Sequence, residues 1–143
     1  MLMGHVKIHH TYNPARMHAI LQNPTGGVAN DMMKRGIRVQ ARARINLQRP
    51  PRRVDTGKLI SSIQIRIFMF RGYPAVRVGS DLDYAIYVHE GTGIYGPRHH
   101  LILPKHGKFL VFKGKDGHTV FARSVKGMPP NPFLADALAA AAY

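Results

Sequence analysis

The sequence predicts an α+β fold in which a long N-terminal helix and a short C-terminal helix pack on a mainly antiparallel sheet, with an additional β-hairpin. Two segments, residues 26–48 and 133–141, have apolar residues at helical spacing. Between them, residues 64–79 hold two strand-like runs separated by a turn sequence. The order of the chain is therefore helix, then strand and turn, then helix again.

The length of 143 residues predicts one domain. We expect an N-terminal extension at 1–25 and a single α+β domain over 26–143, with a loop and hairpin insert at about 94–126. There is no cysteine, which excludes disulfides and thiolate metal sites, and no run of about 18 apolar residues that would indicate a membrane partner. The formal net charge of +14 predicts a polyanion or an acidic protein surface as a partner.

The N-terminal extension is expected to contain one short helix. Asn13 is an N-cap type and Pro14 suits the first helical position, so the helix would run to about Leu21 or Gln22. The sequence Asn-Pro-Thr-Gly-Gly then breaks it. Residues 1–12 fit either a terminal strand or a loose arm.

The long helix over about 26–48 is amphipathic. Its apolar side is formed by Val28, Met32, Val39, Ala43 and Leu47, widened by Met33 and Ile37. Its opposite side carries the bases Lys34, Arg35, Arg38, Arg42 and Arg49. These bases have no Glu at i,i+4, although a merely solvated helix commonly mixes signs. A face directed at DNA or an acidic partner therefore stays open beside plain solvation.

A turn at residues 54–63 connects this helix to the sheet. Asp55 and Thr56 are helix N-cap types, Gly57 permits a sharp change of backbone direction, and Leu59 begins a short apolar face. We interpret the segment as a hinge of one or two helical turns, the alternative being a surface connection with no further role.

Two strand segments carry phenylalanine. In the strand over 64–70, one face begins polar and ends in Phe68 and Phe70, which predicts that this face becomes covered partway along. The second hairpin spans 108–123 and turns at Gly-Lys-Asp-Gly.

Residues 84–93 have strand composition, but a short helix is equally compatible with them. Glu90 is the only glutamate, and in so basic a chain we expect it to pair with an Arg or Lys. The pair would lie within the subunit or across a subunit boundary, and an ordinary exposed acid is the alternative. The loop that follows contains an apolar run at 101–103 that could form a short strand.

No constellation in the sequence supports catalysis. The histidine pairs at 9–10 and 99–100 lack zinc spacing, and on a strand their side chains would point to opposite sides. A catalytic carboxylate pair or a two-metal site could be assembled from Asp55, Asp81, Asp83 and Glu90, but nothing in their spacing requires one. We therefore expect no enzyme, no catalytic residue, no metal and no cofactor.

Three motifs in order resemble a known family. The first is Val-Asp-Thr-Gly-Lys-Leu at 54–59 with Ser62-Ile63, the second Tyr84-Ala85 with Tyr87-Val88 and Glu-Gly-Thr at 90–92, and the third Pro-Phe-Leu at 132–134 with Ala137-Leu138. Together they resemble the tail-completion, or head–tail joining, family of long-tailed bacteriophages, whose members are often labelled neck or minor tail proteins. The resemblance covers about residues 28–142.

The resemblance implies a structural protein without catalysis. It implies an oligomeric ring, expected to be a hexamer, between the capsid connector or stopper and the tail terminator or tail tube, with genomic DNA passing through the channel. It places the chain in the virion neck after assembly in the host bacterial cytoplasm. The matching positions, expected to serve the fold and the interfaces, are Asp55, Thr56, Gly57, Leu59, Tyr84, Tyr87, Glu90, Gly91, Thr92, Phe133 and Leu134.

The hairpin over 108–123 lies in the insert, which the simplest pattern of the family lacks. Its apolar strands would expose an edge unless a neighbour covers it. We therefore interpret it as an assembly element that includes Phe109, Phe112 and Phe121.

Two other functions compete with this interpretation. A stand-alone basic nucleic-acid-binding protein would explain the net charge and the basic stripe. A nuclease would need Asp55 or Glu90 to hold a metal.

Overall fold

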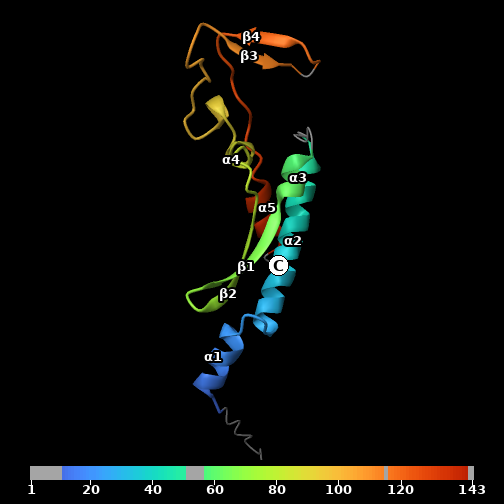
Figure 1. Cartoon of the computed structure of the whole chain (residues 1–143), viewed down its shortest axis with the longest axis vertical. Helices are drawn as coiled ribbons and strands as arrows, with labels where there is room; N and C mark the ends of the chain where they lie inside the picture. Colours follow the sequence, from blue (N-terminus) through green and yellow to red (C-terminus); the bar gives the residue numbers. More distant parts are fainter. Residues whose placement is uncertain (1–10, 51–56, 115, 142–143) are drawn as a thin grey trace, which may run out of the picture.

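The computed structural model describes residues 11–50, 57–114 and 116–141 and has the α+β fold that the sequence predicts (Figure 1). The elements in order are α1 (Pro14–Gln22), α2 (Gly27–Gln48), α3 (Lys58–Ser62), β1 (Gln64–Phe70), β2 (Tyr73–Gly79), α4 (Ala85–Glu90), the 3-10 helix η1 (Gly93–Tyr95), β3 (Leu110–Lys113), β4 (Thr119–Ala122) and α5 (Phe133–Ala141). The strands form two separate antiparallel hairpins, β1–β2 and β3–β4.

Helix α2 is the longest element, and it packs on α5 and on both strands of the β1–β2 hairpin. Its buried residues are Ala29, Gly36, Val39, Ala43 and Leu47, which form a narrow stripe. The predicted apolar side was too wide, because Ile37 is 52% exposed and Met32 is also exposed. Ile37 follows Gly36 around the helix and lies off the stripe that the hairpin and α5 cover.

The β1–β2 hairpin turns through Arg71 and Gly72, which both have positive φ angles, 51° and 83°. Two such residues match the twist of the flanking strands. The predicted cover over Phe68 and Phe70 is wrong, because both rings are exposed. Arginine side chains approach the rings instead, with the Arg77 guanidinium 5.2 Å from the centre of the Phe68 ring.

One hydrophobic core joins the four helices α2, α3, α4 and α5. Its buried members are Val39, Ala43, Leu47, Leu59, Ile63, Val88, Phe133 and Ala137. Of the two structures compatible with residues 84–93, the helix is found, and its residue Val88 reaches this core. The core therefore lies where the end of α2, the start of the first hairpin and the two later helices meet. We call α2, α3, the first hairpin, α4 and α5 together the body.

Residues 91–131 form an arm that extends from this core and carries the β3–β4 hairpin at its far end (Figure 1). The two sides of the arm are joined by backbone hydrogen bonds, including Thr92 N–H to the Met128 carbonyl at 2.8 Å and Ile94 N–H to the Lys126 carbonyl at 2.9 Å. The predicted short strand at 101–103 is reduced to a single bridge between Ile102 and Val125. The second hairpin forms where the sequence predicts it.

We expect Gly36→Ala to lower the free energy of unfolding by about 1–3 kcal/mol, as overpacked core substitutions do. A Cβ atom at this position would lie 2.6 Å from Val76 Cγ1 and 3.3 Å from Ile65 Cγ2, and both of these side chains are β-branched and stiff. Urea unfolding of the purified chain measures the change. Gly27→Ala is the matched control, because its Cβ would meet nothing within 4 Å. Equal stability of the two variants would contradict the close packing of α2 on the hairpin.

Candidate assembly site at the junction of body and arm

The first motif is described from Gly57 onwards, and Asp55 and Thr56 lie outside the described residues. Gly57 occupies the N-cap position of α3 with a left-handed φ of 73°, a conformation that glycine adopts without steric cost. Its carbonyl accepts a hydrogen bond from Ser61 N–H at 3.1 Å. Leu59 is buried in the core, so the described part of this motif redirects the chain and anchors it.

Two polar side chains of α2 hold the point where α3 leads into β1. The Ile63 carbonyl accepts hydrogen bonds from Gln40 Nε2 at 2.6 Å and from Arg44 Nη2 at 3.1 Å. These contacts fix the angle between α2 and the first hairpin. Sequence reasoning missed both residues, although polar side chains at i and i+4 beside the apolar stripe are a signal for such a role.

The second motif divides into an exposed part and a buried part. Tyr84, the N-cap residue of α4, and Tyr87 and Glu90 within the helix are exposed, whereas Val88 is buried. Among the described residues, no cation lies within ion-pair distance of Glu90. The expected pairing of Glu90 within the subunit is therefore wrong for this part of the chain, and a partner across a subunit boundary remains a proposal.

Gly91 and Thr92 lock α4 to the segment that leads into α5. Gly91 is buried with a φ of 81°, and a Cβ there would lie 2.8 Å from both the Met128 carbonyl oxygen and the Pro130 nitrogen. The Thr92 hydroxyl accepts a hydrogen bond from Met128 N–H at 3.0 Å. These two motif residues therefore serve the fold.

The third motif supplies the largest buried ring. Phe133 is 1% exposed and lies edge-to-face with His89, with ring centres 5.4 Å apart. The Phe133 carbonyl accepts a hydrogen bond from Asn46 Nδ2 at 3.2 Å, while Leu134 is half-buried beside the core. Leu59, Val88 and Phe133, one residue from each motif, thus lie in the same core cluster.

An open groove of about 510 Å³ runs between the outer side of α4 and the arm. Ile86, Tyr87 and Glu90 line one wall, and Arg98 and Lys105 are among the arm residues that line the other. The groove is lined by both apolar and charged side chains. Within the described ranges, no group of three or more metal-ligating side chains is found.

The basic side of α2 is exposed as predicted, and one of its bases is paired. Lys34, Arg38, Arg42 and Arg49 are exposed and have no ion pair among the described residues. Arg35 differs because its Nε bonds Asp31 Oδ2 at 2.8 Å and its side chain lines an apolar groove. Four unpaired cations therefore remain available to an anionic partner.

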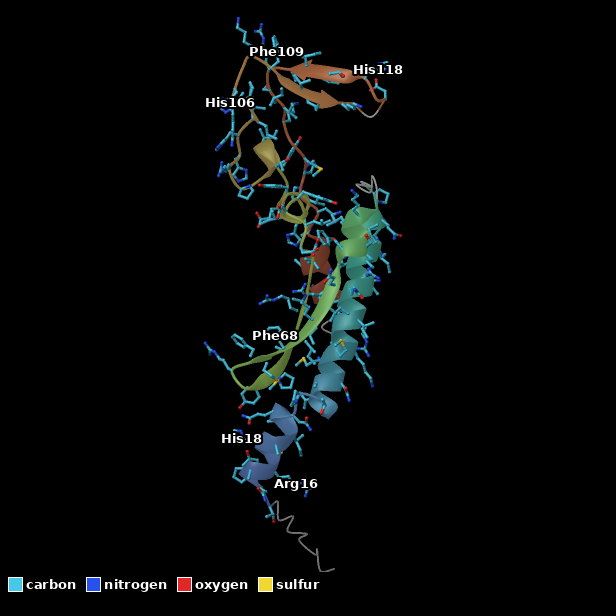
Figure 2. All side chains as sticks on the ribbon, viewed as in Figure 1. Arg16, His18, Phe68, His106, Phe109 and His118 are labelled. Atoms are coloured by element: carbon cyan, nitrogen blue, oxygen red, sulfur yellow. The ribbon has the colours of Figure 1, made fainter. Side chains whose placement is uncertain are left out.

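The second hairpin exposes all three of its phenylalanine side chains. Phe121 is 65% exposed, and Phe109 and Phe112 are also exposed. The Arg123 guanidinium lies 5.9 Å from the centre of the Phe109 ring, which shields part of it. Figure 2 places Phe109 and His118 at opposite ends of this hairpin, far from α1.

Comparison with known proteins returned no relatives: no family model, no curated protein and no solved structure matches the chain. In the part of the chain that the structure describes, none of the helices has the length and apolarity needed to cross a membrane.

We expect Gly91→Ala to cost about 3 kcal/mol or more, because it adds a backbone clash to a φ,ψ combination of 81° and 175° that is essentially restricted to glycine. Gly107→Ala is the matched control: its φ is 85°, but its Cβ would meet nothing within 4 Å, so only about 1–2 kcal/mol of strain is expected. Urea unfolding gives both values, and amide exchange at Thr92 reports on the junction itself. If the two variants are equally stable, the close approach of α4 to Met128 is refuted.

Proposed function

We propose that this chain is a structural head–tail joining protein of a long-tailed bacteriophage, which completes the neck as an oligomeric ring. The observation that carries the proposal is the meeting of the three motifs in one core. The motifs are separated by 20 and 39 residues of sequence, yet each contributes a buried side chain to the same cluster. A chance resemblance of short segments would not require that they fold together.

The large exposed surface area of the chain supports its assembly into an oligomer. The chain exposes 11628 Å², whereas a compact monomer of 16.0 kDa exposes about 7,400 Å². Full extension of the residues outside the described ranges would account for about 3,000 Å², which leaves an excess of roughly 1,900 Å² in the described part. Two contacts of about 800–1,000 Å² per subunit, one to each neighbour in a ring, would cover this area.

The basic face of α2 is compatible with the same setting. In a ring around the genome, Lys34, Arg38, Arg42 and Arg49 can face DNA in the channel or an acidic surface of a neighbouring ring. The proposed partners are further copies of this chain, the head connector or stopper, the tail terminator or tail tube, and DNA.

The same four cations favour a second candidate, a stand-alone nucleic-acid-binding protein. The two functions differ in the behaviour of the purified chain. A stand-alone binder would bind duplex DNA as a monomer, with an affinity that falls steeply as salt rises. A joining protein would bind DNA weakly by itself and form rings or enter particles.

Removal of the gene from its phage tests the favoured function. We expect electron micrographs to show DNA-filled heads and finished tails that fail to join, because the missing ring is the surface on which they meet. A copy supplied from a plasmid should restore joined particles. Intact virions without the gene would reject the proposal.

The β3–β4 hairpin gives a second test, because an isolated two-stranded hairpin is marginally stable in water and needs a covering partner. We expect deletion of residues 108–123 to leave a folded, soluble protein that cannot complete particles. The measurements are circular dichroism, sedimentation and the titre of the complemented phage.

His118→Ala at the hairpin turn is the control for this deletion, since its side chain makes no contact that holds the two strands together. The control should give a normal titre. Normal infectious particles from the deletion variant would show that the hairpin takes no part in assembly.

A further inference from the structure

Helix α1 touches β2 and α2 but buries little of its surface against them. It has nine residues, begins with a capped turn in which Asn13 Oδ1 accepts a hydrogen bond from Arg16 N–H at 3.1 Å, and buries none of its residues. Met17, Ile20 and Leu21 lie on one face at i, i+3 and i+4, and all three are exposed. A helix of this length is marginal in water by itself, so its apolar face needs a partner.

An ordered turn directs α1 away from the body of its own subunit. The Asn23 side-chain oxygen accepts hydrogen bonds from Thr25 N–H at 2.9 Å and from the Thr25 hydroxyl at 3.0 Å, and Gly26 N–H bonds the Asn23 carbonyl. The last residue of α1, Gln22, lies beside Gly72 at the tip of the first hairpin. Figures 1 and 2 show α1, with Arg16 and His18, beyond that tip.

The body carries an apolar groove that lacks an occupant in the described part of the chain. It lies between α2, the β1–β2 hairpin and α5, measures about 700 Å³, and includes Met32, Phe68, Val76 and Leu138 in its lining. Leu138 is 63% exposed although it belongs to a helix that is otherwise anchored in the core. The turn at Asn23 keeps α1 of the same subunit from reaching this groove.

We propose that α1 of one copy lies in this groove of the next copy. An amphipathic helix that lays its i, i+3 and i+4 residues into an apolar groove is a recurrent mode of recognition. Each copy would donate one helix and accept one, which is a heterologous contact of the kind that closes into a ring. The proposal rests on the self-association in the proposed function, not on the head–tail location, and the area excess estimated above is large enough for two such contacts.

The charged residues on the two surfaces would not attract each other, so the proposed contact depends on apolar packing. Arg16 and His18 flank the apolar face of α1, and Arg77 and His89 are in the lining of the groove. Arg35 also lines the groove but is bonded to Asp31. Because the two surfaces carry charge of the same sign, added salt should strengthen the association rather than dissolve it.

Cysteine cross-linking tests the proposal cleanly, because the natural chain has no cysteine. Met17→Cys and Leu138→Cys variants are purified separately, mixed and oxidised. Each variant has a single cysteine, so a disulfide between residues 17 and 138 must join two copies. We expect these disulfide-linked dimers at a yield at least tenfold above that from a mixture of Ala19→Cys with Leu138→Cys. Ala19 lies about 200° around the helix from Met17 and serves as the matched control.

A second pair of variants measures the association itself. Sedimentation should show at least tenfold weaker self-association for Ile20→Asp and a change below twofold for Ala19→Asp, while circular dichroism confirms that the body is folded in both. A full-length chain that stays monomeric, equal cross-linking of the Met17 and Ala19 variants, or unchanged association of Ile20→Asp would each overturn the proposal.

These outcomes are separate from the test of the proposed function. If rings form but the Met17→Cys and Leu138→Cys variants do not cross-link, the joining function is left intact and only this contact is rejected. Intact virions in the absence of the gene would reject the joining function, while the cross-linking result would still stand.

Discussion

The buried ring of Phe133 is the contact on which the arrangement of the chain depends. It lies in the core with Leu47 of α2 and Val88 of α4, and its own carbonyl is bonded by Asn46. Burial of such a side chain contributes about 1.5–3 kcal/mol, a large part of what so small a core can supply. Without it, α5 would lose its anchor on α2. Residues 128–131, which are hydrogen-bonded to Val88 of α4 and to Thr92, would then lose the support that α5 gives them.

The sequence was sufficient for the elements whose signals are local. The helices at 14–22, 27–48 and 133–141 and both hairpins follow from spacing, capping and turn chemistry that act within a few residues. The choice between strand and helix at 84–93 depended instead on Val88 reaching a core built by distant segments. The same applies to Ile37 and Phe68, because only the tertiary structure decides that their side chains stay exposed in one subunit.

The residues of the candidate site could be predicted from the sequence, but not which of them are buried and which are exposed. Leu59, Gly91 and Phe133 are buried and hold the fold, whereas Tyr84, Tyr87 and Glu90 of the same motif set face outward. A linear motif does not separate these two roles, since both produce a fixed pattern of residues. The hydrogen bonds of Gln40 and Arg44 to the Ile63 carbonyl span about twenty residues of sequence and could not be read from either segment alone.

A small core with ordered projections has a consequence for assembly. α1, the basic face of α2, the outer side of α4 and the second hairpin all leave surface uncovered in one subunit, and they lie on different parts of the molecule. In the proposed ring, contacts between copies would add stability that the isolated chain lacks, and the folded state would be linked to protomer concentration. Because the proposed contacts join unlike surfaces, each added copy would present a new free surface until the ring closes, and closure would end the growth.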